Sequence, residues 1–169
     1  MIRLLYITYL LCLVTLSTGC SSQSGEPANM DYKDLEEQLE KYGVIITCVK
    51  EATYPLIRIR NDESIFSVRA KKIEYENGGS LLVWEYPDRE SAVTETQLIS
   101  RDGYDLNNPE KQLMTHIDWI SPPHWFQKDK LIVLYVAPSL PADDHETLAA
   151  VRKILGQQFA GKGPVREAE

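Results

Sequence analysis

Two runs of consecutive apolar residues, without alternating polar residues, stand out along the chain. Residues 131–137 read LIVLYVA and residues 81–84 read LLVW. A strand that is covered on one side only alternates apolar and polar positions, whereas a strand covered on both sides does not. We therefore predict a sheet whose two faces are both covered, mostly by this chain itself.

Three amphipathic helices are predicted beside these strands. The first runs from Asp31 to Tyr42, the second begins at Asp88, and the third runs from Asp143 to Gln158. An aspartate stands at the start of each helix, where its carboxylate can accept hydrogen bonds from free backbone N–H groups. The apolar faces are expected to comprise Tyr32, Leu35, Leu39 and Tyr42, then Ala92, Thr96 and Ile99, then Leu148, Val151, Leu155 and Phe159.

The remaining β-type runs lie at residues 44–49, 56–59, 65–75 and 116–120. A turn is expected at residues 77–79 and a loop at residues 102–109. Pro122-Pro123 should interrupt the strand that precedes it, because proline cannot donate a hydrogen bond to a sheet. The segments 80–86 and 130–136 each follow a turn and precede a helix. We predict an α+β fold: an antiparallel sheet with packed helices, built from two β-β-α units after an N-terminal helix and strand. The helices that begin at Asp88 and Asp143 should then share one face of the sheet.

The first 20 residues have the order of an export signal. Arg3 precedes residues 4–16, which carry no charge and form a run shorter than the roughly 20 apolar residues of a membrane-spanning helix. The sequence LSTGC at 16–20 resembles the lipobox of bacterial lipoproteins cleaved by signal peptidase II, with Ser17 where that family usually has Leu. The resemblance implies that Cys20 carries diacylglycerol, with acyl chains such as palmitate. The alternatives are an ordinary secretory signal or an N-terminal helix that stays in the membrane.

This interpretation divides the chain into four parts. Residues 1–19 form the signal, 20–29 the lipidated cysteine and a flexible tether, 30–160 a single α+β domain, and 161–169 a loose tail. When fully extended, residues 21–29 reach about 30 Å. We expect a lipid anchor on the extracytoplasmic face of the cell membrane, or at the outer membrane if the bacterium has one.

Composition and charge narrow the classes of partner. Hydrophobic residues make up 43% of the chain and charged residues 25%, which is typical of a globular protein. Without Arg3, 17 of the 18 basic residues remain against 25 acidic ones, a formal charge of −8. This charge argues against nucleic acid and against electrostatic adhesion to anionic lipid. Membrane attachment would therefore rest on the lipid.

Three cysteines are present, and Cys12 and Cys20 belong to the signal and the lipobox. Cys48 is then the one cysteine of the mature domain, so no intramolecular disulfide is expected. Because Cys48 alternates with Val44 and Ile46, we predict a buried thiol that packs in the core.

Two groupings could carry chemistry, although neither matches a known motif. His116 and Asp118 would share a strand face, and His124 could approach them through the proline turn to complete a zinc site of a small metal-dependent hydrolase. Ser121, His124 and Asp129 are the residue types of a nucleophilic triad, but the chain has no G-x-S-x-G elbow around Ser121. Neither grouping outweighs a structural role, so we predict no catalytic residue, metal or cofactor.

Aromatic residues beside the double proline are the best binding candidates. Trp119, Trp125 and Phe126 flank Pro122-Pro123, and with Trp84 and Tyr86 of an earlier strand they could line a groove for a glycan or peptide, although aromatic residues on strands more often fill the core. Trp125 and Phe126 are the expected exception, because they lie beside a rigid corner that is expected at the surface. The stretches WISPPHWF, LIVLYV and LGQQFAG are similar to small lipoproteins of Gram-positive bacteria, a resemblance that implies no activity. We predict a non-catalytic envelope domain that uses Trp125 and Phe126 to contact a protein, peptide or wall polymer.

Overall fold

The computed structural model describes residues 29–52, 64–138 and 145–162. Its elements are α1 (Tyr32–Lys41), β1 (Ile46–Glu51), β2 (Ala70–Tyr75), η1 (Glu76–Gly78), β3 (Ser80–Glu85), α2 (Arg89–Thr96), β4 (Asp105–Asn108), β5 (Leu113–His116), β6 (Pro123–Lys128), β7 (Leu131–Val136), α3 (His145–Leu155) and β8 (Ala160–Gly161). The signal, Cys20, the strand at 56–59 and the helix start at Asp143 were predicted from sequence and lie outside the described residues.

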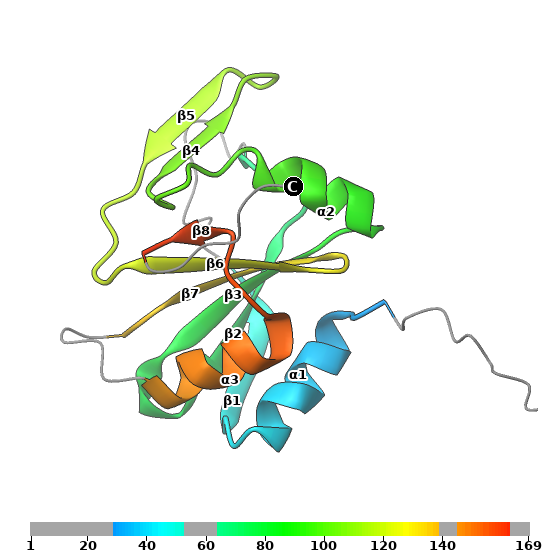
Figure 1. Ribbon diagram of the computed structural model, residues 1–169, viewed down its shortest axis with the longest axis vertical. Coiled ribbons are helices and arrows are strands. Elements are labelled where there is room, and N and C mark those ends of the chain that lie inside the picture. The colour runs from blue at the N-terminus through cyan, green and yellow to red at the C-terminus, as the bar shows by residue number, and fades with distance from the viewer. Residues whose placement is uncertain (1–28, 53–63, 139–144, 163–169) are drawn as a thin grey trace, which may run out of the picture.

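A six-stranded antiparallel sheet in the order β1-β2-β3-β7-β6-β8 forms the centre of the fold (Figure 1). A separate hairpin consists of β4 and β5. After α1 and β1, the chain forms two β-β-α units, β2-β3-α2 and β6-β7-α3. The predicted α+β class and the order of these units are therefore confirmed.

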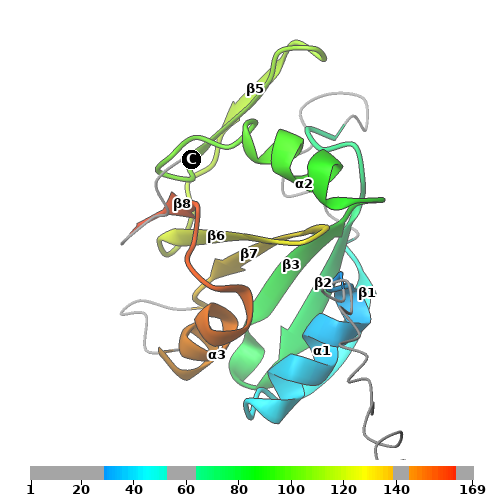
Figure 2. The same ribbon diagram turned by 45° about the vertical axis from the view of Figure 1, so that its right-hand side comes forward.

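Both faces of the central strands are buried, as their apolar runs predict. In β7, Leu131, Val133 and Tyr135 belong to one core with α1 and α3, while Ile132 and Leu134 belong to a second core with α2 and the hairpin. Figures 1 and 2 show α1 and α3 on one side of the sheet, and α2 with the hairpin on the other. We call these sides the α1/α3 face and the α2 face.

The two helices that follow equivalent strands lie on opposite faces, so the expectation that they share one face was wrong. Only residues 86–88 connect β3 to α2. Tyr86 is buried on the α2 face, and its hydroxyl donates a hydrogen bond to Glu95 at 2.7 Å. This short connection directs α2 to its face, whereas in the sequence residues 137–144 lie between the end of β7 at Val136 and the start of α3 at His145.

The start of the domain is fixed at the end of the sheet that carries the β6–β7 turn. The Met30 N–H donates to Asp129 in that turn at 3.0 Å. Asp31 then caps α1 by accepting from the N–H groups of Lys33 and Asp34. Tyr42 was predicted on the buried face of α1, but the chain leaves the helix there and the side chain is 50% exposed.

A β-bulge in β1 overturns the predicted burial of Cys48. Ile46 pairs with Tyr75, but Cys48 pairs with Glu74, so Thr47 is an extra residue in β1. An extra residue reverses the faces of all side chains after it. Cys48 therefore points away from the face on which Ile46 packs, and its thiol is exposed.

The segments around the hairpin and the double proline also differ from their predictions. Residues 105–108, expected in a loop, form β4, and the strand expected at 116–120 is displaced to β5, which ends at His116. The prolines precede and begin β6, because a proline can occupy the first position of a strand without interrupting a ladder. Residues 117–120 therefore lie between β5 and β6 and belong to neither strand.

The C-terminal segment extends the sheet beyond the predicted domain end. Gly161, assigned to the loose tail, pairs with His124 of β6. Gly161 has φ +107°, and a Cβ there would lie 2.0 Å from the Pro123 carbonyl oxygen, so this pairing requires glycine. Earlier, α3 ends at Leu155, and Phe159, expected on its apolar stripe, packs against the core of the α2 face instead.

Candidate functional groove

The two aromatic side chains predicted to form a surface patch are fully buried. Trp125 faces the α2 face and Phe126 the α1/α3 face, and both have 0% exposure. The Trp125 ring lies 5.6 Å from the ring of Trp84 and 6.2 Å from that of Phe66, centroid to centroid. The predicted partner-binding patch at Trp125 and Phe126 is therefore wrong, because β6 has a helix-covered core on each side.

An apolar groove lies beside residues 117–120, just before the double proline. Its floor consists of Ser80 and Leu82 from β3 with Leu134 and Val136 from β7, on the α2 face. Residues 117–120 form one wall, and the cavity has a volume of about 360 Å³. We call this cavity the 117–120 groove. Leu82 and Leu134 are buried, so the apolar surface that is open to a partner belongs to Val136 and to the wall.

The wall of the groove is held in place by two indole rings. The Gly103 carbonyl accepts hydrogen bonds from Trp119 Nε1 at 3.0 Å and from Trp125 Nε1 at 3.2 Å. The two rings meet edge to face, with centroids 6.4 Å apart. The Ile117 N–H also donates to the Tyr104 carbonyl at 2.9 Å. Trp119 is therefore half-buried in a fixed orientation, while the next residue, Ile120, is 65% exposed.

One rim of the groove is acidic. Asp118 lines the groove, its side chain is fully exposed, and its Oδ1 lies 3.5 Å from His116 Nε2. His116 Nδ1 lies 2.7 Å from Asp105 on the neighbouring strand β4. The hydrogen bond to Asp105 holds the pKa of His116 above its ordinary value of 6.5. This rim, comprising Asp105, His116 and Asp118, therefore carries more negative than positive charge in either protonation state of the imidazole.

On the sheet surface beyond β3, two lysines form ion pairs with one glutamate. Lys72 is the cross-strand partner of Leu82 in the floor, and its Nζ lies 2.8 Å from Glu74. Lys50 on β1 contacts the same carboxylate at 2.9 Å. The hydrogen bonds from these two lysines lower the pKa of Glu74. Because both lysines are paired with Glu74, they do not form a basic patch that is free to bind an anion.

The histidine grouping predicted from sequence is not formed. His116 and Asp118 do lie together, but His124 points to the α1/α3 face, where its Nδ1 lies 2.7 Å from Gln158 Oε1. Burial lowers the pKa of His124. Within the described ranges, no three His, Cys, Asp or Glu side chains form a group that could hold a metal ion. The three-ligand site of the hydrolase alternative is therefore contradicted.

The Ser121, His124 and Asp129 grouping is likewise not assembled. Asp129 lies at the far end of β6 from Ser121 and accepts the Met30 N–H, while His124 is bonded to Gln158. A triad needs the base within hydrogen-bond reach of both the nucleophile and its orienting carboxylate. The strand that separates Ser121 from Asp129 prevents that arrangement.

Comparison with protein-family models, with curated proteins and with solved structures finds no match to this chain. No helix in the described part of the chain is both long and apolar enough to span a bilayer.

Proposed function

We propose that this chain is a membrane-anchored lipoprotein of the bacterial envelope, whose domain binds a partner protein in the 117–120 groove. The anchor is supported by the order of features in residues 1–20: Arg3, an uncharged run, and Cys20 after small residues. The acidic composition also supports the anchor. Electrostatic adhesion to anionic lipid is unfavourable for an acidic domain, so membrane attachment would rest on a covalent lipid.

The observation that carries the binding role is the 117–120 groove itself. Its volume of about 360 Å³ falls at the lower end of the roughly 300–1,000 Å³ range of ligand pockets. Ile120 extends the apolar surface outward from the groove, since it is 65% exposed. An enclosed small molecule would leave that side chain uncovered, whereas a protein surface would cover it.

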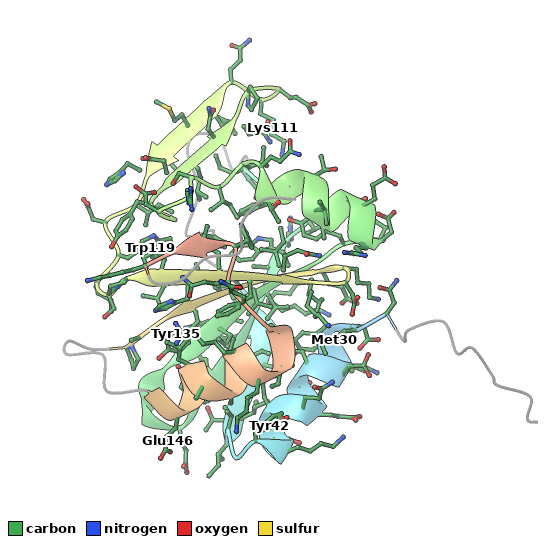
Figure 3. All side chains as sticks on the ribbon, viewed as in Figure 1. Met30, Tyr42, Lys111, Trp119, Tyr135 and Glu146 are labelled. Atoms are coloured by element: carbon green, nitrogen blue, oxygen red, sulfur yellow. The ribbon has the colours of Figure 1, made fainter. Side chains whose placement is uncertain are left out.

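The groove also lies far from the point where the tether would enter. Met30 bonds to the β6–β7 turn at one end of the sheet, and Trp119 lies at the other end, as Figure 3 shows. The six residues of β6 between those ends span about 20 Å. A domain anchored through residues 20–29 can therefore present the groove to partners in the envelope.

The anchor is tested by Cys20→Ser. We expect this variant to lose acyl labelling in cells and to accumulate as an uncleaved or mislocalised precursor. Processing and release to the same extent as wild type would show that the proposed anchor is wrong.

The groove is tested in cells by a photo-crosslinking amino acid at position 120 in the full chain. The matched control position is Met114, which is 73% exposed on β5 and does not line the groove. We expect a discrete crosslinked partner from position 120 that is absent from position 114. Identical crosslinking patterns from both positions, or none from position 120, would refute the groove as the binding site.

A further inference from the structure

The apolar part of the groove defines the kind of group that can enter it. Leu82, Leu134 and Val136 form the floor, and Trp119 forms the wall. Among the described lining residues, only Asp118 is ionisable. An occupant therefore has to insert an apolar side chain and place any polar group beside Asp118.

The rim around Asp118 sets the sign of charge that the occupant can carry. The contacts of Asp118 among the described residues include one cationic group, His116 at 3.5 Å, which is shared with Asp105. Asp102 adds a third carboxylate close enough to raise the pKa of His116. The rim holds one imidazolium and two carboxylates, and with Asp102 beside it this part of the surface is negative, within a chain of formal charge −7.

The lysines on the other side of the floor do not reverse this preference. Lys50 and Lys72 both contact Glu74, at 2.9 Å and 2.8 Å, and their three charges sum to one positive charge. An anionic occupant would have to compete with Glu74 for these cations while facing Asp118 directly. A cationic occupant meets the exposed carboxylate of Asp118. The contact of Asp118 with His116 is 3.5 Å long, which is longer than the contacts of Glu74 with the two lysines.

We propose that the groove takes a basic segment of the partner protein, which inserts a large apolar side chain over Val136 and against Trp119 and places Lys or Arg beside Asp118. This inference rests on the proposed function and adds the chemistry of the partner. The apolar side chain supplies affinity through burial, and the rim supplies selectivity and faster association.

The test uses the full chain on phosphatidylcholine liposomes and three capped peptides: Lys-Leu-Phe-Leu-Lys, Ser-Leu-Phe-Leu-Ser and Glu-Leu-Phe-Leu-Glu. These peptides lack tryptophan, so a change in Trp119 emission reports occupancy while Trp84 and Trp125 remain buried. We expect the basic peptide to bind about tenfold more tightly than the acidic one, because an ion pair replaces a like-charge contact. Added salt should reduce this difference.

Substitutions at two exposed positions distinguish a wrong partner chemistry from a wrong binding site. In Asp118→Lys, the preference should shift toward the acidic peptide, and in Ile120→Glu, binding of all three peptides should weaken. Met114→Glu is the control for added charge on an exposed apolar residue. Equal binding of the three peptides, lost in Ile120→Glu, would overturn the basic partner and keep the groove. No binding, or equal effects of Ile120→Glu and Met114→Glu, would overturn both.

Discussion

Replacing Trp125 by Ala tests whether this residue belongs to the core or to a binding surface. The side chain has 0% exposure, its ring lies within 5.6–6.4 Å of three other aromatic rings, centroid to centroid, and its Nε1 donates to Gly103. Truncation of a buried Trp to Ala costs about 3–5 kcal/mol, because apolar contacts are lost and a cavity remains. A domain has a total stability of about 5–15 kcal/mol, so a large share would be lost.

Equilibrium urea unfolding followed by circular dichroism measures this loss. Trp125→Phe keeps the variant measurable if Trp125→Ala does not fold: it retains a ring and should lose about 1–3 kcal/mol with the hydrogen bond to Gly103. Met114→Ala, at an exposed position, should stay within about 0.5 kcal/mol of wild type. If Trp125→Ala lost less than about 1 kcal/mol, the buried position of this side chain would be refuted.

Three further predictions concern side chains outside the groove. Native Cys48 should react with a bulky maleimide, as peptide mapping can detect, and Cys48→Ala should cost under about 0.5 kcal/mol; protection of the thiol would contradict its exposure. Tyr86→Phe should cost about 1.5–3 kcal/mol by urea unfolding, since the hydroxyl donates to a carboxylate, and less in a Glu95→Gln background; equal costs in both backgrounds would refute that coupling. Burial lowers the pKa of His124, so its contribution to stability is complete above pH 6.5 and declines as the pH falls toward the folded-state pKa. Urea unfolding across this range should show a weaker acid dependence in His124→Gln, and an unchanged dependence would contradict the assignment.

The pattern of apolar residues predicts the layers of this fold better than the details of register. Residues 131–136 lack alternation because both of their faces are buried, and the structure confirms this. Cys48 was misplaced because alternation with Val44 and Ile46 assumes a regular strand. The bulge at Thr47 depends on pairing with β2, which a local pattern does not contain.

The binding surface was predicted at Trp125 and Phe126 rather than at Trp119, because the double proline was interpreted as an exposed corner. Proline can also begin a strand, and Pro123 does so. Trp125 and Phe126 were therefore assigned to the surface, although a strand places them on two buried faces. The residue that does line the groove is Trp119, together with Ile117 and Ile120. The apolar residues on each side of Asp118 are the available sequence signal, but their exposure depends on the distant strands β3 and β7.

The groove follows from the broken symmetry of the two β-β-α units. The central strands β3 and β7 are antiparallel neighbours, and an equivalent crossing after each would place α2 beside α3 on one face. The short connection through Tyr86 sends α2 to the other face, where it contacts β6 and β7. The hairpin and residues 117–120 also lie on that face. Among the described residues, the groove opens at the start of β3 and the end of β7, where Ser80 and Val136 are half-buried.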